Sequence, residues 1–121
     1  MFSVYKILTG ESLPLEYSAA VSGFEPVLGQ TIKLEGGLLA KAGGADNAQF
    51  ICAGSRLSDG RYPVLRLRSD IEFFTETILT AESAGVKVQL AADGLGITAT
   101  AGGSFKVTRV SEKGTYGIFT D

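Results

Sequence analysis

Hydrophobic and polar residues alternate in short runs along this chain, and the runs are separated by turns that contain glycine. The alternation is clearest in residues 2–8, 86–90 and 105–110. A period of two residues is typical of β-strands with one buried face. In the first run it predicts one strand face formed by Phe2, Val4 and Lys6, and the opposite face formed by Ser3, Tyr5 and Ile7.

The pattern that starts at Gln30 and extends to Tyr62 recurs between Val86 and Tyr116. Each copy contains a strand, a glycine turn, a second strand, a Gly-Gly loop, a strand that starts with Phe, a charged glycine turn and a strand that starts near Tyr. The spacing of equivalent residues is similar: Leu34 to Leu90 is 56 residues, Gly43 to Gly102 is 59, Phe50 to Phe105 is 55, and Tyr62 to Tyr116 is 54. We interpret the two segments as two copies of a four-strand β unit.

Turn residues divide the first copy into predicted elements. We expect a strand over 27–34 with a bulge at Gly29, a turn at 35–37, a return strand over 38–42 and an exposed loop at 43–47. A strand over 49–56, a tight turn at 58–60 and a partner strand over 61–68 follow. The Asp59-Gly60 pair is a strong hairpin signal, because both residue types tolerate positive φ.

The second copy is divided in the same way. We expect strands over 86–90, 95–100, 105–110 and 115–119, with turns at 93–94 and 112–114 and a loop at 101–103. Before the first copy, residues 13–21 contain Pro14 and have a mixed pattern, which fits an irregular segment or an edge strand.

The segment 69–84 between the copies is compatible with two structures. Ser69 to Glu72 fits a capping box, and Ile71, Phe74 and Ile78 have helical spacing. The same segment also alternates and is rich in threonine, aromatic and β-branched residues, which favours a strand. We predict a strand and keep the helix as the alternative.

These elements predict an all-β fold, a small barrel or sandwich of about ten short strands. We expect one domain over 1–121, made of an N-terminal strand or arm with an irregular segment (1–22), the first repeat (23–68), the bridge (69–84) and the second repeat (85–121). Exposed strand edges must be covered in such folds, often by a partner chain.

Composition supports a packed fold and excludes several classes of site. Apolar residues make up 45% of the chain, the net charge is −2, and there is one cysteine and no histidine. Histidine-based triads and metal sites, thiolate metal cages and an intrachain disulfide are therefore excluded. We expect an intracellular, reducing origin, no signal peptide, no membrane span and no nucleic-acid partner.

The remaining candidate residues all have structural explanations. We expect Cys52 to be a core residue, Glu72 and Glu76 to be surface charges, and Asp46, Asn47 and Asp93 to serve loops and turns. Gly94-Leu95-Gly96 lacks the pattern of a phosphate-binding loop. The basic concentration Arg56, Arg61, Arg66 and Arg68 is expected to form a solvated or protein-contacting face. We predict no catalytic, cofactor-binding or metal-binding residues, no cofactor and no enzyme activity.

The succession of glycines and strands from Gly23 to Leu67, with its Gly-Gly pair and its Asp-Gly-Arg-Tyr turn, resembles the head decoration (capsid cement) proteins of tailed bacteriophages. The resemblance extends over residues 23–121 and includes chain size and a Gly- and Ala-rich β composition. Residues 12–22 and the Phe73-Phe74 bridge have no counterpart in that family.

The resemblance implies a structural virion protein, made in the host cytoplasm, that binds the capsid exterior and stabilises contacts between major capsid subunits. It also implies a homo-oligomer, a trimer or dimer, in which residues 2–8 act as an arm donated to a neighbouring sheet. Two alternatives are another virion building block, such as a head–tail or tail component, and a carbohydrate- or ligand-binding β module. The absence of tryptophan disfavours the second.

Overall fold

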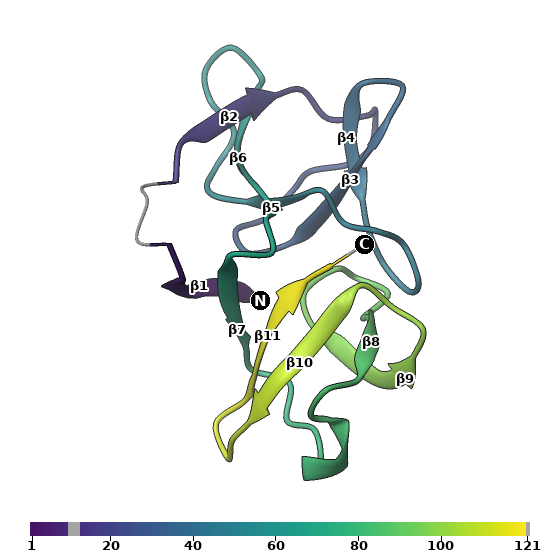
Figure 1. Cartoon of the computed structure of the whole chain (residues 1–121). Coiled ribbons are helices and arrows are strands. Elements are labelled where there is room, and N and C mark those ends of the chain that lie inside the picture. The colour runs from purple at the N-terminus through teal and green to yellow at the C-terminus, as the bar shows by residue number, and fades with distance from the viewer. Residues whose placement is uncertain (10–12, 121) are drawn as a thin grey trace.

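Two antiparallel sheets, one of six strands and one of five, make up the computed structural model, which describes residues 1–9 and 13–120 (Figure 1). The strands are β1 (Phe2–Ile7), β2 (Leu15–Ser18), β3 (Thr31–Glu35), β4 (Leu38–Lys41), β5 (Phe50–Cys52), β6 (Tyr62–Arg66), β7 (Ile71–Thr75), β8 (Lys87–Leu90), β9 (Ile97–Ala101), β10 (Phe105–Val110) and β11 (Thr115–Phe119). A short 3-10 helix (Ala81–Ser83) precedes β8.

Both sheets use the same succession of strands. The five-stranded sheet has the order β2-β6-β5-β3-β4, and the six-stranded sheet has the order β1-β7-β11-β10-β8-β9. The run β6-β5-β3-β4 corresponds strand for strand to β11-β10-β8-β9, and β2 and β7 occupy equivalent positions beside these runs. This matching order agrees with two copies of a four-strand unit. β1 is the additional strand at the edge of the six-stranded sheet.

The all-β prediction is confirmed, and the sheets remain open, without closing into a barrel. In the bridge, Ile71–Thr75 form a strand, as predicted, in place of the alternative helix through Ile71, Phe74 and Ile78, and a 3-10 helix follows at Ala81–Ser83. Residues 15–18 form the edge strand β2. The Glu35-Gly36-Gly37 turn is present, with Gly36 and Gly37 both at positive φ as a tight β3–β4 hairpin requires.

The predicted strand over 27–34 is wrong in its first half. Residues 27–30 form a turn, closed by the Gln30 N–H that donates to Val27 O at 3.1 Å, and β3 begins only at Thr31. Gly29 has a φ of +80° in this turn and is not a bulge. A side chain at Gly29 would collide with Phe2 O, 2.8 Å from the position of its Cβ. The absence of a side chain at Gly29 therefore allows the turn to pack closely against β1.

The predicted strand over 49–56 is also too long, because β5 ends at Cys52. The Ala53 N–H donates to Pro63 O at 2.9 Å, but Pro63 has no N–H to return the bond. The ladder stops there, and the chain reaches the turn at Gly60 through an irregular segment. Gly60 has a φ of +87°, and its N–H donates to Leu57 O at 3.0 Å.

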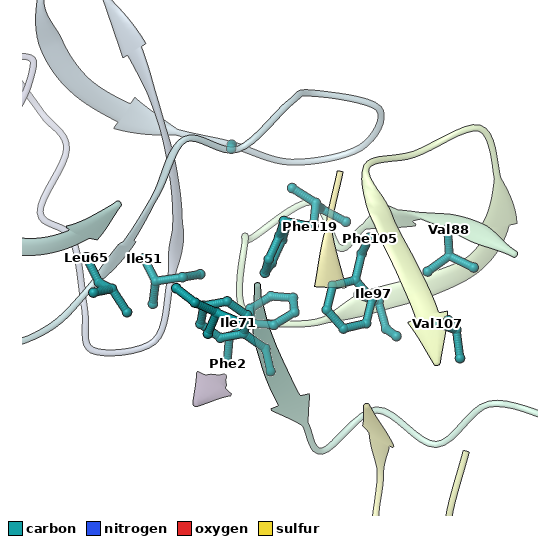
Figure 2. Close-up of a cluster of buried hydrophobic side chains, with 12 residues drawn as sticks. Phe2, Ile51, Leu65, Ile71, Val88, Ile97, Phe105, Val107 and Phe119 are labelled. Atoms are coloured by element: carbon teal, nitrogen blue, oxygen red, sulfur yellow. The ribbon is translucent and has the colours of Figure 1, made fainter. Parts of the chain in front are cut away.

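Buried side chains form two clusters. The larger lies between the sheets and contains four phenylalanines, Phe2, Phe73, Phe105 and Phe119, together with Ile51 and Leu65 from the five-stranded sheet (Figure 2). The smaller contains Ile32, Leu39, Phe50, Cys52, Tyr62 and Val64, all from the five-stranded sheet. Alternation along β5 and β6 explains this division, since adjacent residues of a strand face opposite sides.

Register shifts interrupt three ladders, those of β1 on β7, β10 on β11 and β8 on β9, and the first two change predicted faces. The register of β1 on β7 shifts between Val4 and Lys6, and the register of β10 on β11 shifts between Val107 and Arg109. An extra residue in a strand reverses the face of every later residue. Lys6 consequently lies opposite Glu72, on the outer face, so the prediction that it shares a face with Phe2 and Val4 is wrong.

Candidate functional site

The sequence-predicted candidates have structural roles. Cys52 is fully buried, and burial raises the pKa of its thiol, which donates to Gly54 O at 3.1 Å. Asp46 accepts from the Gly43 N–H and pairs with Lys33. The Gly43 N–H, and secondarily Lys33, lower the pKa of the Asp46 carboxyl. Asp93 accepts from the Leu95 N–H at 2.9 Å. The core and loop roles predicted for these residues are confirmed.

The carboxylates of β7 and its C-terminal end do not act together. Glu72 accepts a hydrogen bond from Thr108 Oγ1 at 2.6 Å. Glu76 pairs with the N-terminal ammonium of Met1 at 2.7 Å, and this ammonium lowers the pKa of the Glu76 carboxyl. Each carboxylate therefore has its own partner.

Three of the four arginines of the first repeat pair with nearby carboxylates, and no ion pair among the described residues includes the fourth, Arg56. Arg66 donates to both carboxylate oxygens of Glu16, at 2.7 and 2.9 Å, and its guanidinium carbon lies 4.8 Å from the centre of the Phe50 ring. Arg61 pairs with Asp59, and Arg68 pairs with Asp70. These pairs leave little excess positive charge on this part of the surface.

An apolar groove runs between β1 and the five-stranded sheet. Its volume is about 310 Å³, and its rim includes Met1, Val4 and Leu28, which are about half exposed. The floor is formed by the buried residues Phe2, Ile51, Cys52, Leu65 and Phe73. The Phe2 N–H donates to Gly29 O at 2.9 Å and joins the 27–30 turn to β1, so both sides of the groove are held in place.

A cluster of aromatic rings and one arginine lies on the outer face of the six-stranded sheet. We call it the aromatic–arginine face and define it by Tyr5, Phe74, Arg109 and Tyr116. The ring of Tyr116 meets Tyr5 at 4.6 Å and Phe74 at 5.0 Å between centroids, both edge to face. The guanidinium carbon of Arg109 lies 3.9 Å from the Tyr116 centroid and 5.8 Å from that of Tyr5.

Four strands contribute to this face, and the bulge in β10 places Arg109 there. β1, β7, β10 and β11 supply Tyr5, Phe74, Arg109 and Tyr116 respectively. Strict alternation along β10 would place Arg109 on the same side as the buried Phe105 and Val107. This face could not be predicted from the sequence, because a bulge has no reliable signal in a single strand.

Among residues 1–9 and 13–120, no group of three or more metal-ligating side chains comes together. No helix in the same ranges is long and apolar enough to cross a membrane. Comparisons with protein-family models, with curated proteins and with solved structures found no match to this chain.

Proposed function

We propose that this chain is a structural virion protein that binds the outer surface of a phage capsid and stabilises contacts between major capsid subunits. The observation that carries the proposal is the apolar groove beside the edge strand β1, whose rim residues Met1, Val4 and Leu28 are exposed. Exposed apolar surface of this kind marks protein–protein contacts. The resemblance of residues 23–121 to decoration proteins supplies the identity of the partner.

A protein that binds only the assembled shell, and not the separate subunits, stabilises the shell by mass action, because a ligand that prefers one state shifts the equilibrium towards that state. The proposal includes a homo-oligomer, since several copies around a symmetry axis can each reach a different capsid subunit. In this proposal, residues 2–7 are a strand of the chain's own sheet and not an arm donated to a neighbouring chain. β1 pairs with β7 of its own chain, and Phe2 is buried in the larger core.

The test is co-sedimentation of the purified protein with expanded capsids of the phage that encodes it. Deleting residues 1–8 would remove a core side chain, so point substitutions on the groove rim are the better probe. Val4→Glu and Leu28→Glu are expected to reduce occupancy of the capsid by at least about tenfold, because each places a charge in an apolar contact. Ile78→Glu is the matched control, since Ile78 is 63% exposed and lies outside the groove.

Full occupancy by the rim variants, or an equal loss with Ile78→Glu, would contradict the assignment of the groove. Failure of the unaltered protein to bind expanded capsids would contradict the capsid proposal itself. Electron microscopy that locates the chain on the tail or at the head–tail junction would favour the alternative of another virion building block.

A further inference from the structure

We infer that the aromatic–arginine face is a docking surface for an acidic protein segment, with a partner carboxylate bound by Arg109. The inference does not depend on binding to capsids. It begins with the charges on this side of the six-stranded sheet.

Exposed cations surround the face, although the whole chain has a net charge of −2. Lys6, Lys106 and Arg109 are exposed, and no ion pair among the described residues includes any of them. Of the carboxylates nearby, Glu76 pairs with the N-terminal ammonium, whereas Glu72 accepts from the neutral Thr108 hydroxyl and keeps its charge. The three exposed cations outnumber this one carboxylate. A negatively charged partner therefore complements this surface.

Arg109 is held in place for such a partner. Its guanidinium lies against the Tyr116 ring, and Tyr116 is in turn fixed by Tyr5 and Phe74. A stacked guanidinium keeps its N–H groups at the edge of its plane, where they can bind a carboxylate with two parallel hydrogen bonds. Because the side chain is already ordered, little rotamer entropy is lost on binding.

A second stacked arginine in the same protein shows the occupant that such a site accepts. Arg66 lies over the Phe50 ring and holds the Glu16 carboxylate with two bonds, at 2.7 and 2.9 Å. Arg109 has the ring beneath it but no carboxylate partner among the described ion pairs. An aspartate or glutamate of another protein would complete the same arrangement. Tyr5, which is 53% exposed, offers apolar contact next to it.

Single-stranded nucleic acid is the competing occupant, because aromatic and basic residues also build its binding surfaces. The ring geometry favours protein. Bases need free aromatic faces, whereas Arg109 covers a face of Tyr116, and Tyr5 and Phe74 meet this ring edge to face. Tyrosine and arginine are also the residues most enriched at protein-binding hot spots.

The experiment is a calorimetric or NMR titration of the full chain with a short poly-L-glutamate peptide, beside oligo-dT of similar charge. We expect the peptide to bind and binding to weaken as salt rises, since these charges are solvent-exposed. Arg109→Gln should weaken binding roughly tenfold or more, as expected for loss of charge-assisted hydrogen bonds. The affinity of Arg109→Lys for the peptide should lie between those of the unaltered protein and Arg109→Gln. Tyr5→Ala should weaken binding without changing the net charge.

Arg66→Gln is the matched control, because it removes the same charge from a stacked arginine that already has a partner. Its affinity for the peptide should equal that of the unaltered protein. Equal losses with Arg66→Gln and Arg109→Gln would overturn the inference, since they would show a net-charge effect only. Tighter binding of oligo-dT, or no binding of the peptide, would also overturn it. No capsid is present in this titration, so its failure is separate from failure of the proposed function.

Discussion

The two sheets share one strand order but stabilise it with different side chains. The six-stranded sheet contributes rings that contact each other, with Phe105 at 5.5 Å from Phe2 and 5.0 Å from Phe119 between centroids. The cluster confined to the five-stranded sheet contains two aromatic residues, Phe50 and Tyr62, and no ring contact among the described residues joins them. Even equivalent residues differ, since Leu34 is 37% exposed and Leu90 is 1% exposed. Topology is thus more tolerant of sequence change than the packing is.

The largest losses of stability should arise at the phenylalanine that begins the third strand of each copy. Phe105→Ala is expected to lower the free energy of unfolding by about 4 kcal/mol, because it leaves a cavity among the rings between the sheets. Phe50→Ala should cost less, about 3 kcal/mol, since one face of Phe50 contacts the exposed Arg66 and the site can collapse. Urea unfolding followed by circular dichroism measures both. A larger loss for Phe50→Ala would show that the smaller cluster dominates stability.

Substitution by valine should change the free energy of unfolding in opposite directions at two fully buried threonines. Thr31 Oγ1 lies within hydrogen-bond distance of Ala42 O and Gly94 O, at 2.9 and 3.0 Å, so Thr31→Val should cost about 1 to 2 kcal/mol. Thr75 Oγ1 is buried without a hydrogen-bond partner among the described residues. Thr75→Val should therefore raise the free energy of unfolding by about 1 kcal/mol.

Thermal and urea unfolding of the two valine variants provide the measurement. A loss of stability in Thr75→Val similar to that in Thr31→Val would indicate that the Thr75 hydroxyl is satisfied, for example by a buried water.

The smallest expected effect concerns a carboxylate present in only one copy. Asp46 fixes the loop after β4 through the Gly43 N–H and Lys33, and the equivalent loop at 101–104 has no carboxylate. The folded pKa of Asp46 is lowered, so its contribution is present above the unfolded pKa of about 4 and is lost as pH falls through the folded value. Its side chain is 40% exposed, and solvent screening limits the contribution to about 0.5 kcal/mol.

Asp46→Asn should accordingly lower stability slightly at pH 7 and match the unaltered protein under conditions acidic enough to protonate Asp46. A difference between the two proteins that persists unchanged into strong acid would contradict this account.

How much of the fold could be predicted differs between the two copies. Phe105–Val110 and Thr115–Phe119 were predicted with their observed bounds, because a Gly-Gly loop precedes the first strand and a glycine turn separates the two. In the first copy, the strand predicted from residue 27 begins at Thr31, since the 27–30 turn bonds to β1 and β5. Those bonds join residues far apart in the sequence. Local patterns therefore could not show them.

The candidate surfaces were predicted least well. Sequence identified the arginines of the first repeat, but most of them bind neighbouring carboxylates. Arg109 was not singled out, because its place beside Tyr5 and Tyr116 depends on a bulge and on the pairing of four strands.

Alternation and glycine turns alone determined that this protein is all-β and that one succession of strands occurs in both halves. Those properties are local, because the face of a residue within a short strand and the position of a turn depend on neighbouring residues. Tertiary structure decided where alternation is interrupted, which apolar side chains remain exposed beside β1, and which arginines pair with a carboxylate of the described residues. These depend on strand pairing across the whole chain, where one extra residue moves a side chain from the core to the surface.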